Sequence, residues 1–198
     1  MQNIYGPCPC GSGKKLKFCC HQKLAAMGPA SLLKQAPSFP VHECWIMEDW
    51  EDGGLAPLLI VRQQPNLKYQ FGLYLVDYYC LGVKSTIYDV NVAYGKIEDI
   101  RSRTPYAWLE FDYQDARGLI LGSIAYARGL GFAPDLTWEN SKYLVEANTP
   151  FDNKFTFGRD GKPLFINGPD DDVASIMKTL QGKDIGYMIG GPESLFQS

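Results

Sequence analysis

Four cysteines near the N-terminus restrict the fold of this chain more than any other sequence feature. The cluster consists of Cys8, Cys10, Cys19 and Cys20. Structural zinc takes four ligands in a tetrahedron, about 2.3 Å from each sulfur. The first pair can bind from one side of a tight turn, because Gly11 and Gly13 allow the backbone to fold back without a Cβ clash. So short a segment has almost no core of its own, and we expect metal binding and folding to be one event.

The compartment of the chain bears on the chemistry of these cysteines. The N-terminus lacks the apolar core of a signal peptide, and the longest apolar runs, such as residues 56–61, fall short of the roughly 20 residues that a membrane span needs. We therefore expect a cytosolic protein, where closely spaced cysteines favour metal over the alternative of two disulfides or unused thiols. Cys44 and Cys80 lie apart in apolar runs and are expected to be buried thiols.

The cysteine spacing resembles that of a known family. The pattern C-x-C-x8-C-C, with Gly11-Ser12-Gly13-Lys14-Lys15 inside the loop, is similar to the SEC-C motif. This motif is named after the C-terminal zinc tail of the SecA translocation ATPase and is attached to many otherwise unrelated bacterial proteins. The resemblance covers residues 6–22 only. It implies a Zn²⁺ ion, with ligands that fall by position on Cys8, Cys10, Cys19 and Cys20. The fourth ligand is Cys or His in different members, so whether His21 can replace Cys20 stays open.

The resemblance also implies that the zinc knuckle docks onto a protein partner or the ribosome. Residues 1–42 hold five lysines and no acidic residue, whereas the remainder holds 14 Lys and Arg against 22 Asp and Glu. A basic arm on an acidic body favours contact with an anionic partner or with the body itself. The residues that we assign to partner binding are Lys14, Lys15, Lys17 and Phe18. Nucleic acid is a further possible partner, with Tyr5 or Phe18 as a stacking surface. The alternative is that the lysines are solvated and that Phe18 packs beneath the knuckle.

The rest of the chain predicts an α+β fold with an antiparallel sheet and about three helices. We divide the chain into a zinc knuckle (1–24), a proline-containing linker (25–40) and one domain (41–198). Predicted strands cover 41–47, 55–63, 69–80 and 108–113, with a hairpin of 154–157 and 163–166 and a last strand at 185–189. One predicted helix covers 115–128, a second begins after Thr137, and a third is capped by Asp170.

The activity of residues 41–198 is left open by the sequence. The segments 126–132 and 157–163 are similar to parts of uncharacterised bacterial proteins, and this similarity implies no function. Our first hypothesis is a non-enzymatic domain that carries the knuckle as a docking tag. The alternative is a metal-dependent, nuclease-like enzyme that the knuckle targets to nucleic acid. Its candidate residues are Asp77, Lys84, Glu110 and Asp112. His42 and Cys44 alternate on one strand and would share a face, as a base and a nucleophile might.

Overall fold

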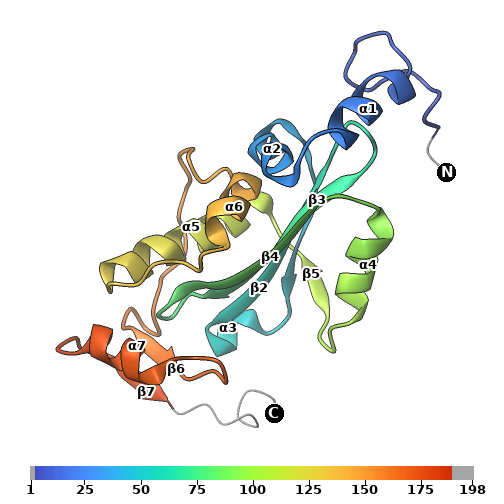
Figure 1. Ribbon diagram of the computed structural model, residues 1–198. Helices are drawn as coiled ribbons and strands as arrows, with labels where there is room; N and C mark the ends of the chain where they lie inside the picture. The colour runs from blue at the N-terminus through green and yellow to red at the C-terminus, as the bar shows by residue number, and fades with distance from the viewer. Residues whose placement is uncertain (1–2, 189–198) are drawn as a thin grey trace.

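An antiparallel five-stranded sheet forms the centre of the protein. The structure, a computed structural model, describes residues 3–188. The strands are β1 (Val41–Met47), β2 (Leu55–Gln63), β3 (Tyr69–Asp77), β4 (Gly82–Val92) and β5 (Trp108–Glu110). Their order is β4-β3-β2-β1-β5, so the first four form a meander and β5 pairs with the free edge of β1 (Figure 1). The predicted α+β class is confirmed.

Seven α-helices lie in the described part of the chain, more than the three or so that we predict from the sequence. They are α1 (Cys20–Ala25), α2 (Pro29–Lys34), α3 (Trp50–Gly53), α4 (Tyr94–Ser102), α5 (Tyr113–Gly129), α6 (Trp138–Ser141) and α7 (Val173–Leu180). Three 3₁₀ turns accompany them: η1 (Leu16–Phe18), η2 (Ala36–Ser38) and η3 (Lys142–Val145). None of the helices among residues 3–188 has the length and apolarity that crossing a membrane requires.

Helices cover both faces of the sheet. The long helix α5 packs on one face, where Leu119 and Ile120 belong to the same buried core as strand residues such as Ile60. The shorter α4 lies on the opposite face, where Ile97 packs with Val61 and Phe71 (Figure 1). Because β2 is buried on both faces, its side chains from Leu58 to Val61 are all apolar instead of alternating with polar ones.

The C-terminal part differs from the predicted hairpin. Residues 154–157 form no strand, and an isolated bridge joins Arg159 to Lys162. Instead β6 (Leu164–Ile166) pairs in parallel with β7 (Gly186–Met188). The helix between these two strands, α7, is capped by Asp172 and not by the predicted Asp170. The Asp172 side chain accepts a hydrogen bond from the Ser175 N–H. The predicted end of the last strand, Ile189, lies outside the described residues.

Residues 25–40, which we predict as a linker, are packed against the body. They contain α2 and η2, and Leu32, Leu33 and Ala36 are buried. Leu32 and Phe39 form a small cluster with Leu24 of α1, and Val90 of β4 packs against it. The proline and glycine spacing that suggests a tether therefore accompanies short helical turns that hold α1 close to the sheet. The division of the chain into three domains stays a prediction.

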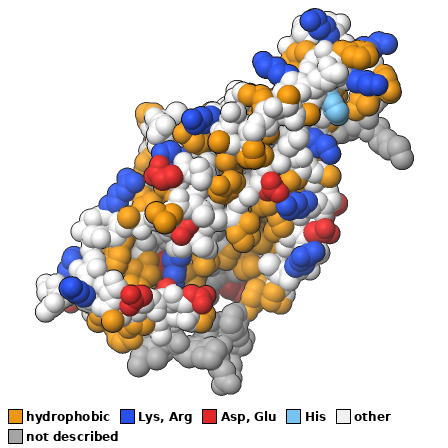
Figure 2. Space-filling view, in the orientation of Figure 1, with side chains coloured by type: hydrophobic (Ala, Val, Ile, Leu, Met, Phe, Trp, Pro, Cys, Tyr) orange, Lys and Arg blue, Asp and Glu red, His pale blue; other side chains and the backbone are white. Residues whose placement is uncertain are grey.

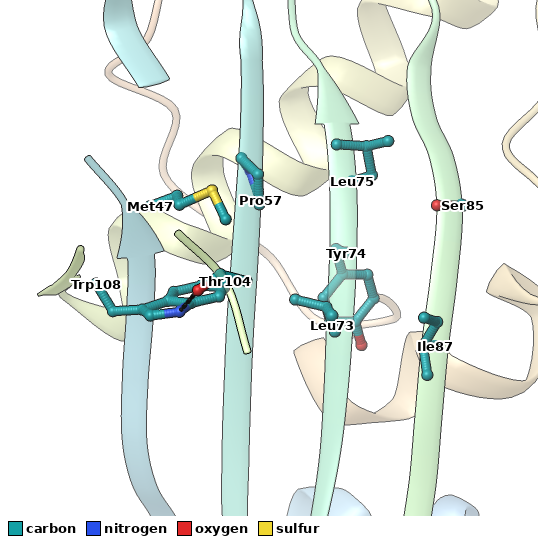
Figure 3. Close-up of a pocket in the computed structure, with 9 residues that line it drawn as sticks. All are labelled: Met47, Pro57, Leu73, Tyr74, Leu75, Ser85, Ile87, Thr104 and Trp108. Carbon is teal, nitrogen blue, oxygen red and sulfur yellow. Dashed lines mark hydrogen bonds between the residues drawn. The ribbon is translucent and has the colours of Figure 1, made fainter. Parts of the chain in front are cut away.

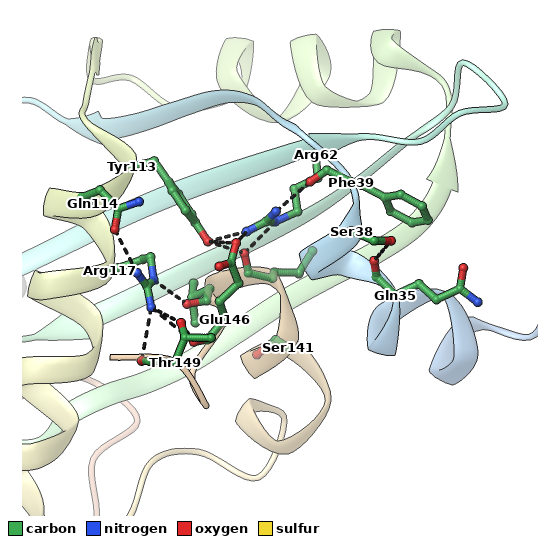
Figure 4. Close-up of polar contacts among 12 residues, drawn as sticks. Gln35, Ser38, Phe39, Arg62, Tyr113, Gln114, Arg117, Ser141, Glu146 and Thr149 are labelled. Atoms are coloured by element: carbon green, nitrogen blue, oxygen red, sulfur yellow. Dashed lines mark hydrogen bonds and ion pairs between the residues drawn. The ribbon is translucent and has the colours of Figure 1, made fainter. Parts of the chain in front are cut away.

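Two buried arginines fix residues 144–149, in the segment that follows α6. The Arg62 guanidinium donates to the carbonyls of Phe39 (2.7 Å) and Leu144 (2.9 Å) and to the Glu146 carboxylate (2.5 Å). The Tyr113 hydroxyl also accepts from Arg62 (Figure 4). Burial alone would raise the pKa of Glu146, but Arg62 and Tyr113 outweigh it and lower that pKa.

Arg117 holds the same segment from α5. Its Nε donates to the Val145 carbonyl at 3.0 Å, and its terminal nitrogen donates to the Thr149 hydroxyl at 2.6 Å (Figure 4). Only 5% of Arg117 and 2% of Arg62 is exposed, so neither guanidinium is free to bind a ligand. We assign both arginines a structural role.

Replacing Arg62 by methionine tests this role. In Arg62→Met the carbonyls of Phe39 and Leu144 lose their donor in a buried site, and Glu146 loses its counter-ion. We expect the free energy of unfolding, measured by urea denaturation, to fall by about 3 kcal/mol. The matched control is Lys162→Met, which breaks the exposed Lys162–Asp184 pair and should leave stability nearly unchanged. Equal effects of the two substitutions would contradict the assigned role.

Candidate metal centre

The four N-terminal cysteines come together in the fold. Their Sγ atoms all lie within 4.8 Å of one another, and those of Cys10 and Cys19 are 3.6 Å apart. A tetrahedral ion with bonds of about 2.3 Å separates its sulfur ligands by about 3.8 Å. The cluster therefore needs only small shifts to hold one metal ion, and its four soft donors suit a thiophilic metal.

A tight loop positions the first pair of cysteines. The Cys8 N–H donates to the Lys14 carbonyl at 2.8 Å, and the Gly11 N–H donates to the Cys8 carbonyl at 3.2 Å. Gly11 and Gly13 have φ angles of 74° and 71°, in the left-handed region that favours glycine. The two glycines thus have the role that we predict from the sequence.

A 3₁₀ turn and a short helix position the second pair. Cys19 follows η1, and its N–H donates to the Leu16 carbonyl at 3.1 Å, while Cys20 is the first residue of α1. Leu16 is buried beneath this turn, with 1% of its surface exposed. His21 is not part of the cluster of four sulfur atoms. The fold therefore places Cys20, not His21, with the other three cysteines.

The electrostatics of the cluster favour a bound cation. Hydrogen bonds from Ser12 and Cys8 lower the pKa of Cys10 to about 6. Burial and the neighbouring thiols Cys8 and Cys10 raise the pKa of Cys20. One thiolate thus forms readily, and its charge opposes ionisation of the next. A divalent cation at the centre removes this repulsion, because it stabilises all four thiolates together.

Basic and aromatic side chains are exposed beside the cluster. Phe18 is 60% exposed and Tyr5 is 55% exposed, so the alternative in which Phe18 packs beneath the knuckle is wrong: Leu16 is buried there instead. The Lys17 ammonium lies 4.9 Å from the centre of the Tyr5 ring. A groove beside this pair is lined by Ile4, Lys17, His21, Gln22, Ala25 and Ala26. Figure 2 shows basic and hydrophobic side chains, with no acidic ones visible, at the end of the molecule where α1 lies.

The carboxylates of the enzyme hypothesis have separate structural roles. Asp77 is buried and caps the turn after β3, accepting from the N–H groups of Tyr79 (3.0 Å) and Cys80 (2.8 Å). Asp112 caps α5. Among residues 3–188, the four cysteines are the one group of three or more His, Cys, Asp or Glu side chains placed to hold a metal.

The remaining two candidates of that hypothesis are also accounted for. Lys84 pairs with Asp171 at 2.7 Å, and both side chains are largely buried. Glu110 is exposed on β5, the short edge strand. Burial raises the pKa of the Asp77 carboxyl and the charge of the nearby Lys84 opposes this larger effect, but the four candidates do not form one metal-binding group.

The expected His42–Cys44 pair is also separated. A β-bulge between Val41 and Glu43 interrupts the alternation of β1. The His42 ring packs at 5.0 Å from the ring of Tyr69, which belongs to the core under α4, whereas Cys44 is buried in the core under α5. Burial raises the pKa of Cys44 to about 12. The prediction that the two side chains share a face is wrong, because the bulge reverses the side to which His42 points.

Comparison with protein-family models, with curated proteins and with solved structures gives no match to this chain. The function is therefore argued from the geometry of the cysteine cluster and its surroundings.

Removing one cysteine from each pair tests the cluster. We expect Cys10→Ser together with Cys19→Ser to abolish stoichiometric metal, because two ligands cannot replace a closed set of four. Metal per chain is measured by inductively coupled plasma mass spectrometry on the purified protein. Cys44→Ala, which removes a cysteine outside the cluster, should keep the full metal content. A double variant that still holds one equivalent would rule out this ligand set.

The buried Asp77 predicts a pH dependence of stability. Burial raises its pKa from 3.8 to about 6, so the folded protein binds more protons than the unfolded chain between these values. The contribution of Asp77 to stability is therefore greatest below about pH 4 and falls as the pH rises through about 6. Asp77→Asn keeps the turn acceptor without the charge. We expect it to stabilise the protein by about 3 kcal/mol at pH 7 and to leave stability unchanged near pH 4.

Urea unfolding of both proteins at several pH values measures this effect. The difference between them cancels the contribution of the metal ligands, which both share. Parallel pH profiles for the native protein and Asp77→Asn would show that Asp77 does not titrate in this way.

Proposed function

We propose that the N-terminal segment is a zinc-binding docking module of the SEC-C type, carried by an α+β domain of unknown activity. The observation that carries the proposal is the closeness of the four sulfur atoms, all within 4.8 Å of one another. Four protein ligands leave no position for water or substrate, which makes the site a structural one.

Zinc is the metal that this donor set favours. A tetrahedral group of four thiolates is typical of structural zinc sites and of iron–sulfur centres. The knuckle has a single loop of eight residues between its cysteine pairs, in keeping with one ion. The proposal includes a cytosolic location, where cysteines stay reduced and available to metal.

The surface around the cluster supports docking. Lys14 and Lys15 are exposed on the loop, and Phe18 presents most of its ring to solvent. Four thiolates and one Zn²⁺ carry a net charge of about −2. The five lysines of residues 1–42 outweigh this charge, so the segment stays positive overall. An exposed apolar ring with Lys17 beside it, and two more lysines on the same loop, suits an acidic protein surface or the ribosome.

Charge reversal on the knuckle tests the docking proposal. We expect the triple variant Lys14→Glu, Lys15→Glu and Lys17→Glu to keep its zinc and to lose at least about tenfold in affinity for its partner. Binding is measured by co-sedimentation with purified ribosomes and by cross-linking mass spectrometry in the native cell. Phe18→Ala should weaken the same interaction without changing its salt dependence, because the ring carries no charge.

A matched control comes from the body. Lys162→Glu changes an exposed lysine far along the chain and should leave partner binding unchanged. Partner binding that is equal in the native protein and in the triple variant would contradict the docking role. Metal-dependent cleavage of nucleic acid by the full chain would favour the nuclease-like alternative instead.

A further inference from the structure

The outer edge of β4 has the properties of an unoccupied pairing site. At eleven residues, β4 is the longest strand of the sheet, and it pairs on one side only, with β3. The opposite edge strand of the sheet is β5, which has three residues. A long edge strand exposes main-chain donors and acceptors that can pair with another strand.

Both ends of this edge are blocked, and its middle is open. At one end the Val83 carbonyl accepts from the Asp135 N–H at 3.1 Å, and at the other the Val90 N–H donates to its neighbour Asp89 at 2.8 Å. Within residues 3–188, the main chain of Ser85 to Tyr88 makes no hydrogen bond outside its ladder with β3. The free edge is therefore confined to a short central stretch.

Two bulges define the centre of that stretch. The β3–β4 register shifts once between Val83 and Ser85 and again between Asp89 and Val92, leaving residues 85–89 in regular register. Ile87 is the middle residue. This stretch contains no proline, lysine or internal bulge, three of the devices that usually block edge pairing.

An apolar groove adjoins the open stretch. It has a volume of about 140 Å³ and runs across the sheet from Met47 and Trp108 to Ser85 and Ile87 on β4 (Figure 3). The helix α4 leaves this part of the face uncovered, and Ile87 is 62% exposed. Exposed apolar surface that continues to a free strand edge is typical of an association site.

We propose that two copies of this chain pair through β4 about a two-fold axis at Ile87, forming one continuous ten-stranded antiparallel sheet. The two-fold axis of such an antiparallel pair is perpendicular to the sheet, so the same face of both copies lies on one side. The regular stretch 85–89 pairs with itself over its full length only when its middle residue lies on this axis. Ile87 then lies opposite Ile87 of the second copy, and the two apolar grooves meet.

The chemistry of the stretch is complementary to itself in this register. Ser85 of each copy lies opposite Asp89 of the other, which places a hydroxyl donor beside a carboxylate. No like charges come opposite each other, because Asp89 is the single charged residue of the stretch and pairs with Lys96 in its own chain.

Sedimentation velocity on the full-length, metal-loaded protein tests the dimer. We expect a concentration-dependent dimer for the native chain and a monomer for Ile87→Lys, because two lysines would then be forced opposite each other. Leu109→Lys changes an exposed leucine on β5, at the other edge of the sheet, and should remain dimeric. Metal content should be the same in all three proteins, so failure of this proposal is distinguishable from failure of the zinc site.

Cross-linking tests the register. Directly opposed residues have Cβ atoms about 5 Å apart, so Ile87→Cys should give a disulfide-linked dimer under mild oxidation, whereas Leu109→Cys should not. A native protein that stays monomeric across the concentration series would overturn the proposal. A dimer that survives Ile87→Lys would also overturn it, because the interface would then lie elsewhere.

Discussion

The buried guanidinium of Arg62 is the interaction on which the arrangement of the other elements depends. It lies on β2 at the centre of the sheet and donates to segments that are far apart in the sequence, through Phe39, Tyr113 and Glu146. No apolar side chain could replace it, since the Phe39 carbonyl needs a hydrogen-bond donor in a buried site and the partly exposed Glu146 carboxylate needs a counter-ion. Arg62 thereby fixes the start of α5, the end of η3 and the segment that leads into β1 relative to one another.

The same contact connects the cysteine cluster to the body. The Phe39 carbonyl accepts from Arg62, while the Phe39 side chain packs with Leu24 and Leu32. Cys20 packs against that cluster and also contributes a sulfur to the candidate metal centre. A metal ion that fixes Cys20 would therefore stabilise α1 on the sheet as well as the knuckle loop. The docking surface would then be presented at a defined orientation by the body.

The sequence predicts best the parts of this protein that local rules determine. The bounds of β1 and β2 agree with the prediction residue for residue, because both strands are short, largely apolar runs that lie next to turn signals. The cysteine cluster is also predictable, since ligand spacing and two glycines with positive φ are local properties.

Features that depend on tertiary contacts were harder to predict. The strand β4 carries polar residues on an exposed edge, and α4 buries only Ile97, so neither has a clear periodicity. The bulge that separates His42 from Cys44 depends on the register with β2, which no local pattern encodes. The structural role of Arg62 has one sequence signal, an arginine at the end of an apolar run, but its acceptors are set by the fold.

The local structure around the bound metal tests the proposed zinc site directly. Zinc K-edge X-ray absorption on the purified full-length protein measures the ligand type and the bond length. We expect one zinc per chain with four sulfur ligands at about 2.3 Å and no nitrogen in the coordination shell. A shell of three sulfurs and one nitrogen would move the fourth ligand from Cys20 to a histidine. Oxygen ligands, or a different metal, would contradict the closed structural zinc site.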